Sequence, residues 1–307
     1  MLNSINFVVL GDSSIAAQLG KKGTATDIVI YDRKTADTVY TWTGPANDKV
    51  QSLMQAVNIA EYAILNAVKL DKFLGEQIMA VDTANLTDGF ILHSYEVDRE
   101  KLKMLLKGTA LENFRFVDSI EVLKQEITDI KPKKLEGPLM IPVDHAFDVK
   151  GVGTVVLGVV KQGTVKVYDE LMLLPTKKSI TIKSIQMHDD PVEISFSTAR
   201  VGLAIKGLSA NDISRGDVIC APGPIKVSSG AIVVKFTKSP FFKGELPEHH
   251  TYMFSVGMQI RAARVKFDGE TLLVTPERPI AYTEGQTLVL LKPDSPGTRI
   301  VGKGSIE

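Results

Sequence analysis

The fold is decided by the stretch Pro142-Val-Asp-His-Ala-Phe-Asp-Val-Lys-Gly-Val-Gly-Thr-Val-Val-Leu-Gly158, which is followed closely by Lys161-Gln-Gly-Thr-Val-Lys166. Runs of β-branched residues alternate here with glycines. β-branched side chains favour strands, and a glycine lets strands bend and pack closely because it has no Cβ. The stretch therefore predicts short strands joined by glycine turns.

The same pattern continues over residues 139–224 without helical periodicity. Further strands are expected at 153–160, 163–167, 170–174, 179–186, 201–206 and 217–220. Short, evenly spaced strands without helices are typical of a closed β-barrel. A break at Ala221-Pro-Gly-Pro224 precedes a second all-β segment, residues 225–307. Its main strands are expected at 231–237, 252–256, 259–267, 270–275 and 287–292.

On the N-terminal side, residues 1–131 alternate strand and helix patterns. Strands are expected at 6–10, 27–31, 38–42, 62–68, 89–93 and 114–117, and helices at 47–56, 71–83, 98–106 and 119–128. This alternation predicts βαβ units around a mostly parallel sheet. Residues 132–138 are charged, contain two prolines and are predicted to be a linker. We therefore expect an α/β domain (1–131), this linker and two β-barrels (139–224 and 225–307).

The opening stretch resembles the start of domain 2 in EF-Tu, elongation factor 1-alpha and SelB. In that family an acidic residue, a Phe and a Gly-x-Gly-Thr-Val-x-x-Gly run follow in this order. The resemblance continues through Arg200-Val-Gly-Leu-Ala-Ile-Lys-Gly207 and Ile213-Ser-Arg-Gly-Asp-Val-Ile-Cys-Ala221, and it is nearest to SelB. Residues 225–307 resemble domain 3 more weakly, through Gln259-Ile-Arg-Ala-Ala-Arg-Val265 and the terminal Arg299-Ile-Val-Gly-Lys-Gly-Ser-Ile306. The resemblance implies a P-loop GTPase-like α/β domain followed by two β-barrels.

The same resemblance implies a ligand. In family members the barrels hold aminoacyl-tRNA: domain 2 helps form the pocket for the esterified amino acid, and domain 3 rests against the T-arm. Carried over by position, Asp144, His145, Phe147 and Arg200 fall where the pocket lining lies. An ionic pair suits the recognition of a polar or charged aminoacyl group, because buried charges need partners. The residues alone leave core packing open for Phe147, a surface position for Arg200, and a solvated turn for Asp144 and His145.

The first domain departs from the family in its phosphate-binding segment. A Gly-x-x-x-x-Gly-Lys-[Ser/Thr] loop after the first strand would hold phosphates and Mg²⁺ with its backbone N–H groups, a lysine and a hydroxyl. Here Val9-Leu-Gly11 is followed by Asp12-Ser-Ser-Ile-Ala-Ala-Gln18, without the second Gly or the Lys-Ser/Thr pair. The segment Gly20-Lys-Lys-Gly-Thr24 looks like a phosphate loop, but its order fits the family's switch segment better. Ala25 then replaces the magnesium-binding threonine.

Two further nucleotide motifs depart from the family in the same way. The Asp-x-Pro-Gly-His segment corresponds to Tyr40-Thr-Trp-Thr-Gly-Pro-Ala46, which has neither the Asp nor the His. The guanine-reading Asn-Lys-x-Asp aligns with Tyr95-Glu-Val-Asp98 and keeps only Asp98, for which a helix N-cap role suffices. Gly11 and Asp98 are thus remnants of a nucleotide site. We expect a degenerate GTPase domain without catalytic residues, cofactor or GTPase activity; the alternative is a divergent SelB-type GTPase that uses residues 20–24 or another loop.

Charge and cysteine content limit other functions. Residues 132–307 hold 22 basic and 18 acidic residues, against 14 and 18 in residues 1–131. This balance permits a modest nucleic-acid footprint on the barrels, and scattered solubilising charge explains it equally well. The single cysteine, Cys220, excludes an internal disulfide and a cysteine-based zinc site and is expected to be a buried thiol. His249 and His250 predict no metal site, because adjacent strand residues point to opposite faces.

The remaining expectations concern location and partners. No stretch approaches ~18 uncharged apolar residues, and the start, Met1-Leu-Asn-Ser4, lacks a basic region and a cleavage site. We therefore expect a cytoplasmic, monomeric protein with no membrane association, whose partner is tRNA or aminoacyl-tRNA, with the ribosome as a further candidate. A ribosome-binding regulatory protein without tRNA delivery is the remaining alternative. Without working switches, the domain arrangement is expected to be fixed.

Overall fold

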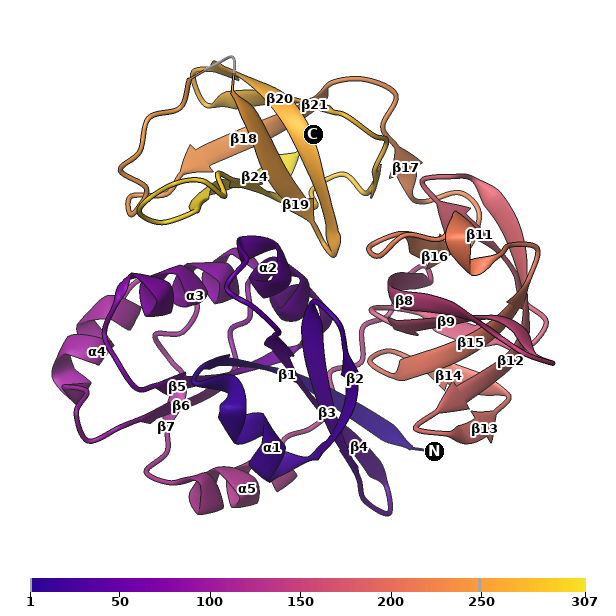
Figure 1. The fold of residues 1–307 in the computed structure, drawn as a ribbon, viewed down its shortest axis with the longest axis horizontal. Coiled ribbons are helices and arrows are strands. Elements are labelled where there is room, and N and C mark those ends of the chain that lie inside the picture. Colours follow the sequence, from indigo (N-terminus) through magenta and orange to yellow (C-terminus); the bar gives the residue numbers. More distant parts are fainter. Residues whose placement is uncertain (1, 248–249) are drawn as a thin grey trace. The chain divides into compact units, whose positions relative to one another are not determined.

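A computed structural model describes residues 2–247 and 250–307. It has an α/β N-terminal part followed by two closed β-barrels, as the sequence predicts (Figure 1). The chain divides into two compact units. The first unit consists of Met1–Pro132, Phe236–Pro247 and Val289–Gly304, and the second of Lys133–Lys235, Glu248–Leu288 and Ser305–Glu307.

A seven-stranded sheet forms the centre of the first unit. Its strands are β1 (Asn3–Gly11), β2 (Lys21–Ala25), β3 (Ile28–Lys34), β4 (Thr38–Pro45), β5 (Tyr62–Ala67), β6 (Gly89–His93) and β7 (Arg115–Phe116). The order is β2-β3-β4-β1-β5-β6-β7. Strands β4, β1, β5, β6 and β7 are parallel, whereas β2 and β3 are antiparallel additions at one edge. The mostly parallel sheet is thus confirmed.

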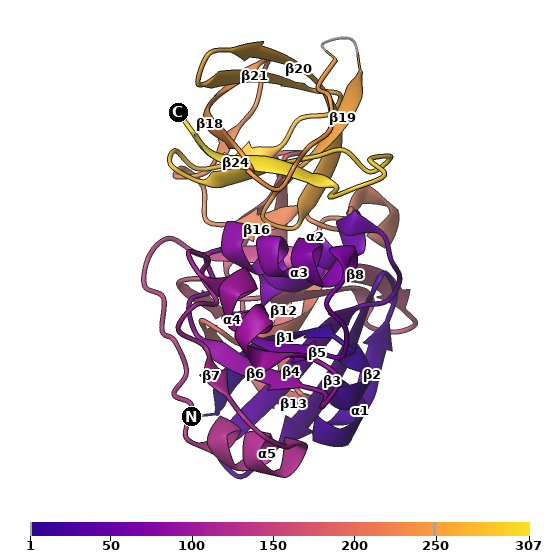
Figure 2. The same ribbon diagram turned by 90° about the vertical axis from the view of Figure 1, so that its left-hand side faces the viewer.

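Helices cover both faces of this sheet (Figure 2). They are α1 (Ala16–Leu19), α2 (Val50–Ile59), α3 (Lys72–Thr83), α4 (Arg99–Leu106) and α5 (Ile120–Thr128), with a 3-10 turn, η1 (Ser13–Ile15), before α1. Asp71, Asp98 and Ser119 cap α3, α4 and α5 by accepting hydrogen bonds from backbone N–H groups of the first turn. Under α1 and α5, Phe7 and Trp42 are fully buried in the core, with ring centroids 6.4 Å apart.

The second unit contains the barrel that begins with the stretch quoted first. Its strands are β8 (Met140–Val149), β9 (Gly153–Val159), β11 (Glu170–Leu174), β12 (Lys178–Met187), β15 (Arg200–Lys206) and β16 (Val218–Cys220). They follow the order β11-β16-β8-β9-β15-β12, and pairing of β11 with β12 closes the barrel. A Cβ at Gly158 would lie 2.6 Å from the Pro142 carbonyl oxygen, so glycine is required where β9 crosses β8.

Short strands accompany this barrel. Strand β13 (Asp190–Val192) extends the sheet beyond β12, and β10 (Thr164–Lys166) pairs with β14 (Ile194–Phe196). A 3-10 turn, η2 (Ala210–Asp212), precedes β16.

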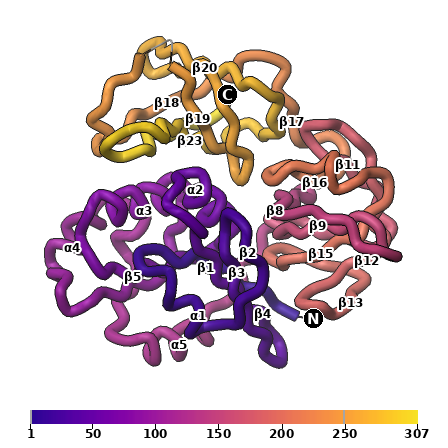
Figure 3. Tube along the Cα trace, in the orientation of Figure 1, coloured from indigo at the N-terminus to yellow at the C-terminus, as the bar shows by residue number. Residues whose placement is uncertain are grey.

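The C-terminal strands close a second barrel (Figure 3). They are β18 (Ile232–Lys238), β19 (Thr251–Val256), β20 (Gln259–Asp268), β21 (Thr271–Pro276), β23 (Thr287–Leu291) and β24 (Ile300–Ile306), in the order β18-β21-β20-β19-β23-β24. A separate pair is formed by β17 (Lys226–Val227) and β22 (Ala281–Tyr282). Among the helices of the described residues, none is long and apolar enough to cross a membrane.

Candidate functional site

The carboxyl ends of β1 and β4 border a cavity of about 200 Å³. Ligands of open α/β sheets bind at this edge, where strand order reverses. The cavity is lined by Gly11 at the end of β1 and Ser13 after it, by the loop of residues 45–49, which begins at the last residue of β4, by Glu76 and Gln77 of α3, and by Arg299. It therefore occupies the place where the family's nucleotide motifs would meet.

Protein acceptors take up three backbone N–H groups at the end of β1 and in the loop that follows. The Gly11 N–H donates to Gln77 Oε1 (2.7 Å), and the Asp12 N–H donates to the Asn66 carbonyl oxygen (2.9 Å). The Ser14 N–H donates to Asp12 Oδ1 (3.0 Å). Gly11 has φ +76, and a Cβ there would lie 1.9 Å from the Asn66 carbonyl oxygen, which explains why this glycine is present. A phosphate-binding loop instead directs such N–H groups at its ligand.

The loop after β1 also packs against the end of β4. A Cβ on Gly44 would lie 3.2 Å from Ser13 Cβ and 3.5 Å from its hydroxyl oxygen. Asp12 adds a negative charge, which opposes phosphate. Among the described residues, no group of three or more His, Cys, Asp or Glu side chains could hold a metal ion. The loop after β1 therefore carries an acidic side chain and lies against the end of β4.

The other positions that align with nucleotide motifs lie at the start of a helix and in an edge strand. Asp98 caps α4, because its Oδ1 accepts from the Glu100 and Lys101 N–H groups at 3.0 and 3.2 Å, as the sequence predicts. The segment of residues 20–24, which looks like a phosphate loop in the sequence, is largely extended. Lys21 and Lys22 lie in β2, opposite Asp32 and Tyr31 of β3. This strand is exposed at the edge of the sheet.

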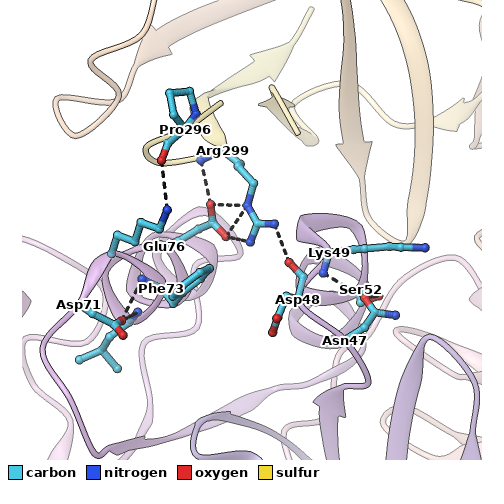
Figure 4. Close-up of polar contacts among 11 residues, drawn as sticks. Asn47, Asp48, Lys49, Ser52, Asp71, Phe73, Glu76, Pro296 and Arg299 are labelled. Carbon is cyan, nitrogen blue, oxygen red and sulfur yellow. Dashed lines mark hydrogen bonds and ion pairs between the residues drawn. The ribbon is translucent and has the colours of Figure 1, made fainter. Parts of the chain in front are cut away.

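A buried ion pair closes one side of the cavity (Figure 4). The side chain of Glu76 is 4% exposed and that of Arg299 is 18% exposed. Arg299 Nε lies 3.1 and 3.0 Å from the two Glu76 carboxylate oxygens, and the Arg299 backbone N–H donates to Glu76 Oε2 at 2.8 Å. Arg299 Nη1 donates to the Asp48 carbonyl oxygen. This arrangement was not predicted, because 223 residues separate the partners.

In the second unit, the structure pairs two of the predicted aminoacyl-site residues. The side chain of Asp144 is 1% exposed and that of Arg200 is 20% exposed. Arg200 Nε and Nη2 donate to the Asp144 carboxylate at 3.2 and 3.3 Å. A solvated turn is therefore wrong for Asp144, which lies buried within β8.

A register shift between Val143 and His145 determines which way the side chains of this part of β8 point. Pairing of β8 with β9 moves from Val143↔Gly158 to His145↔Leu157, so Asp144 is an extra residue on β8. Such a bulge re-aims the side chains that follow. The His145 and Phe147 rings lie 5.5 Å apart at 34° and are both partly exposed. Phe147 is therefore not part of the buried core.

A second buried ion pair lies beside the first. Arg261 Nη2 is 3.4 Å from Asp217 Oδ1, with side chains 17% and 4% exposed. Burial raises the pKa of Asp217, while the Ser214 N–H and the Arg261 charge act in the opposite direction. The Val143 N–H donates to the Asp217 carbonyl oxygen at 2.8 Å, which links the two pairs through the backbone. Both residues lie within stretches that resemble the family, but nothing in the sequence indicates that they pair.

Of the two adjacent histidines, His249 lies outside the described residues. The His250 ring is 5.2 Å from the Tyr252 ring in an edge-on arrangement. Cys220 is buried, as predicted, and burial raises the pKa of its thiol to about 11.

Similarity to known proteins identifies the family to which this chain belongs. The family model described as Elongation factor Tu domain 2 matches residues 153–220. The uncharacterized protein MJ0325 of Methanocaldococcus jannaschii is 31% identical over 303 residues, covering 95% of this chain and 96% of that protein. Elongation factor 1-alpha of Methanosarcina mazei is 33% identical over 171 residues, or 54% of this chain and 40% of that protein. The chain belongs to the EF-Tu/SelB-like elongation factor family.

Other family members match at similar levels. The selenocysteine-specific elongation factor of Methanocaldococcus jannaschii is 30% identical over 167 residues, 47% of this chain and 35% of that protein. This chain thus spans less than half the length of the named elongation factors it matches. The structure of SelB from Methanococcus maripaludis with the GTP analogue GppNHp superimposes with a TM-score of 0.84. At 24% identity, covering 100% of this chain and 79% of that one, this likeness shows a shared fold.

Proposed function

We propose that this elongation factor-like protein binds tRNA or aminoacyl-tRNA through its β-barrels, in the cytoplasm, and does not hydrolyse GTP. The observation that carries the proposal is the loop after β1. Its Gly11 and Asp12 N–H groups are bonded to Gln77 and Asn66. Phosphate binding relies on free, pre-oriented donors and positive charge, and this loop offers an aspartate instead of the lysine.

The barrel site supports the ligand half of the proposal. Asp144 neutralises Arg200 in the barrel wall, and the His145 and Phe147 rings remain partly exposed beside it. Exposed rings stack with nucleobases, and this stacking is worth about 1–3 kcal/mol per base. The paired charges suit a polar aminoacyl group or the 3′ end of tRNA.

Calorimetry tests the nucleotide half. GTP, GDP and GppNHp are titrated into the full chain with Mg²⁺ present, and no binding is expected in the micromolar range. Micromolar binding of GTP would overturn this half and favour a divergent GTPase.

Filter binding tests the tRNA half, with charged and uncharged tRNAs at low salt, where backbone contacts are strongest. We expect binding to the wild type and roughly tenfold weaker binding to Phe147→Ala. Tyr168→Ala is the matched control, because Tyr168 is also an aromatic residue of the second unit and is 78% exposed. Absence of binding to every tRNA would contradict the proposal, and ribosome binding that persists without tRNA would favour a regulatory protein.

A further inference from the structure

Helix α3 bonds to the loop after β1 on one side and to residues of the segment Val289–Gly304 on the other. Gln77 accepts the Gly11 N–H, and its neighbour Glu76 holds Arg299. One turn and a half further on, Asp82 accepts Lys303 Nζ at 3.0 Å. All these residues belong to the first unit, so α3 is fixed from both sides.

Arg299 ties a third element to this helix (Figure 4). Its guanidinium lies against both Glu76 carboxylate oxygens and also donates to the Asp48 carbonyl oxygen. Asp48 lies in the loop that leads from β4 into α2, and Asn47 organises the same loop by accepting the Lys49 N–H and the Ser52 hydroxyl. A planar guanidinium with several donors holds a carboxylate and a carbonyl in fixed directions at once.

The loop that Arg299 contacts lies at the cavity described above. The loop of residues 45–49 overlaps the end of residues 40–46, the segment that aligns with the family's Asp-x-Pro-Gly-His, and it lines the cavity together with Gly11 and Arg299. In switching proteins, a bound phosphate and its Mg²⁺ order such a loop, and the order is lost when the ligand leaves. A side chain of the same chain is always present, so the order it imposes does not depend on ligand concentration.

We propose that the Glu76–Arg299 pair is a permanent latch: it holds the 45–49 loop and α3 in one arrangement, so the loop is ordered without a nucleotide. The latch explains how the proposed protein could keep this loop ordered without GTP. It rests on the proposed function in one respect, the absence of a bound nucleotide. The burial of Glu76 adds to its strength, because breaking a buried pair leaves a charge without compensation.

Amide hydrogen exchange on the full chain tests the latch. In the wild type, exchange of residues 45–53 is expected to be slow and unchanged by GTP with Mg²⁺. Arg299→Met is expected to speed exchange of residues 45–53 at least about tenfold, because Asp48 and Glu76 lose their partner. Lys303→Met is the matched control: it removes another cation of the same segment from α3, and exchange of residues 45–53 is expected to stay as in the wild type.

Two further variants keep the test decisive. If near-ultraviolet circular dichroism shows that Arg299→Met is unfolded, Arg299→Lys keeps the charge but loses the fork, and an intermediate exchange rate is expected. Glu76→Gln should raise exchange of the same residues, since the neutral amide holds the guanidinium less strongly. Unchanged exchange at residues 45–53 in a folded Arg299→Met variant would overturn the latch alone. Calorimetric GTP binding with no change in exchange there would overturn the proposed function alone.

Discussion

Asp144, at 1% exposure, holds the guanidinium of Arg200 through two donors at 3.2 and 3.3 Å. Replacing Arg200 by methionine is expected to lower the free energy of unfolding by about 3–5 kcal/mol, because the buried carboxylate loses its partner. Urea denaturation of the two proteins measures the loss. Arg264→Met serves as the control, since Arg264 is exposed on β20, and its change should stay within about 0.5 kcal/mol.

A double-mutant cycle separates pairing from other losses at this site. Asp144→Asn combined with Arg200→Met should be less destabilised than the sum of the two single variants, because the second change removes a charge that the first left without a partner. Strictly additive losses would show that the two side chains are not coupled.

The buried carboxyl of Asp217 predicts a pH dependence. Burial raises its pKa above the ordinary 3.8, so the folded protein keeps this proton where the unfolded chain has lost it. The stability that this carboxyl contributes is complete below about pH 3.8 and is lost as the pH rises through the folded pKa. The stability of Asp217→Asn relative to the wild type should therefore improve as the pH rises from about 3.8. Unfolding free energies across pH 3–7 measure this difference.

Asp212 supplies a control of the opposite sign. Its pKa is lowered to about 2, chiefly by hydrogen bonds from Lys178 and Ser209. Its contribution to stability is present above pH 3.8 and is lost as the pH falls through about 2. The free energy of unfolding of Asp212→Asn relative to the wild type should therefore fall as the pH rises from about 2 to 3.8. The same sign for both variants would contradict these assignments.

Cys220 should be unreactive in the folded protein. It is 1% exposed, and burial raises the pKa of its thiol from 9.0 to about 11, so almost no nucleophilic thiolate exists at pH 8. Labelling with a thiol-specific disulfide reagent should be slow natively and rapid in denaturant. Because the folded thiol keeps its proton longer, the associated stability should fall as the pH rises from about 9 to 11. Rapid native labelling at pH 8 would contradict this.

Asp98 is expected to act only as a helix cap. Asp98→Ala should cost about 1 kcal/mol of stability, because two N–H groups of α4 lose their acceptor, whereas Asp98→Asn should cost little. Thermal unfolding distinguishes the two variants. If the wild type binds a guanine nucleotide and Asp98→Asn does not, Asp98 would instead have the guanine-recognition role that it has in the family.

The regular elements were predictable wherever local pattern and burial agree. Strand β6 has the predicted bounds, because Gly89–His93 is a short apolar run after a turn. Helix α2 was expected from residue 47 but begins at Val50, since the side chain of Asn47 accepts the Lys49 N–H and keeps Lys49 extended. Strand β2 was not predicted because its residues are polar and mostly exposed, which leaves no alternation to detect.

The candidate sites divide in the same way. Family motifs brought Asp144 and Arg200 to notice, and the structure pairs them. The contacts of Gly11 with Gln77 and Asn66 were beyond prediction, because they depend on how β1, β5 and α3 pack together. The pairing of Glu76 with Arg299 was not predicted, since a distant ion pair leaves no periodicity in a single sequence.

The long separation between Glu76 and Arg299 has a consequence for synthesis. A ribosome makes the chain from its N-terminus at about 5–20 residues per second, so β1 to β7 emerge well before Arg299. During this interval of roughly ten seconds or more the carboxylate of Glu76 has no guanidinium beside it, and α3 has one face without its final contacts. The first unit therefore completes its contacts late in translation. Until then, its nascent form is the one most exposed to chaperones and proteases.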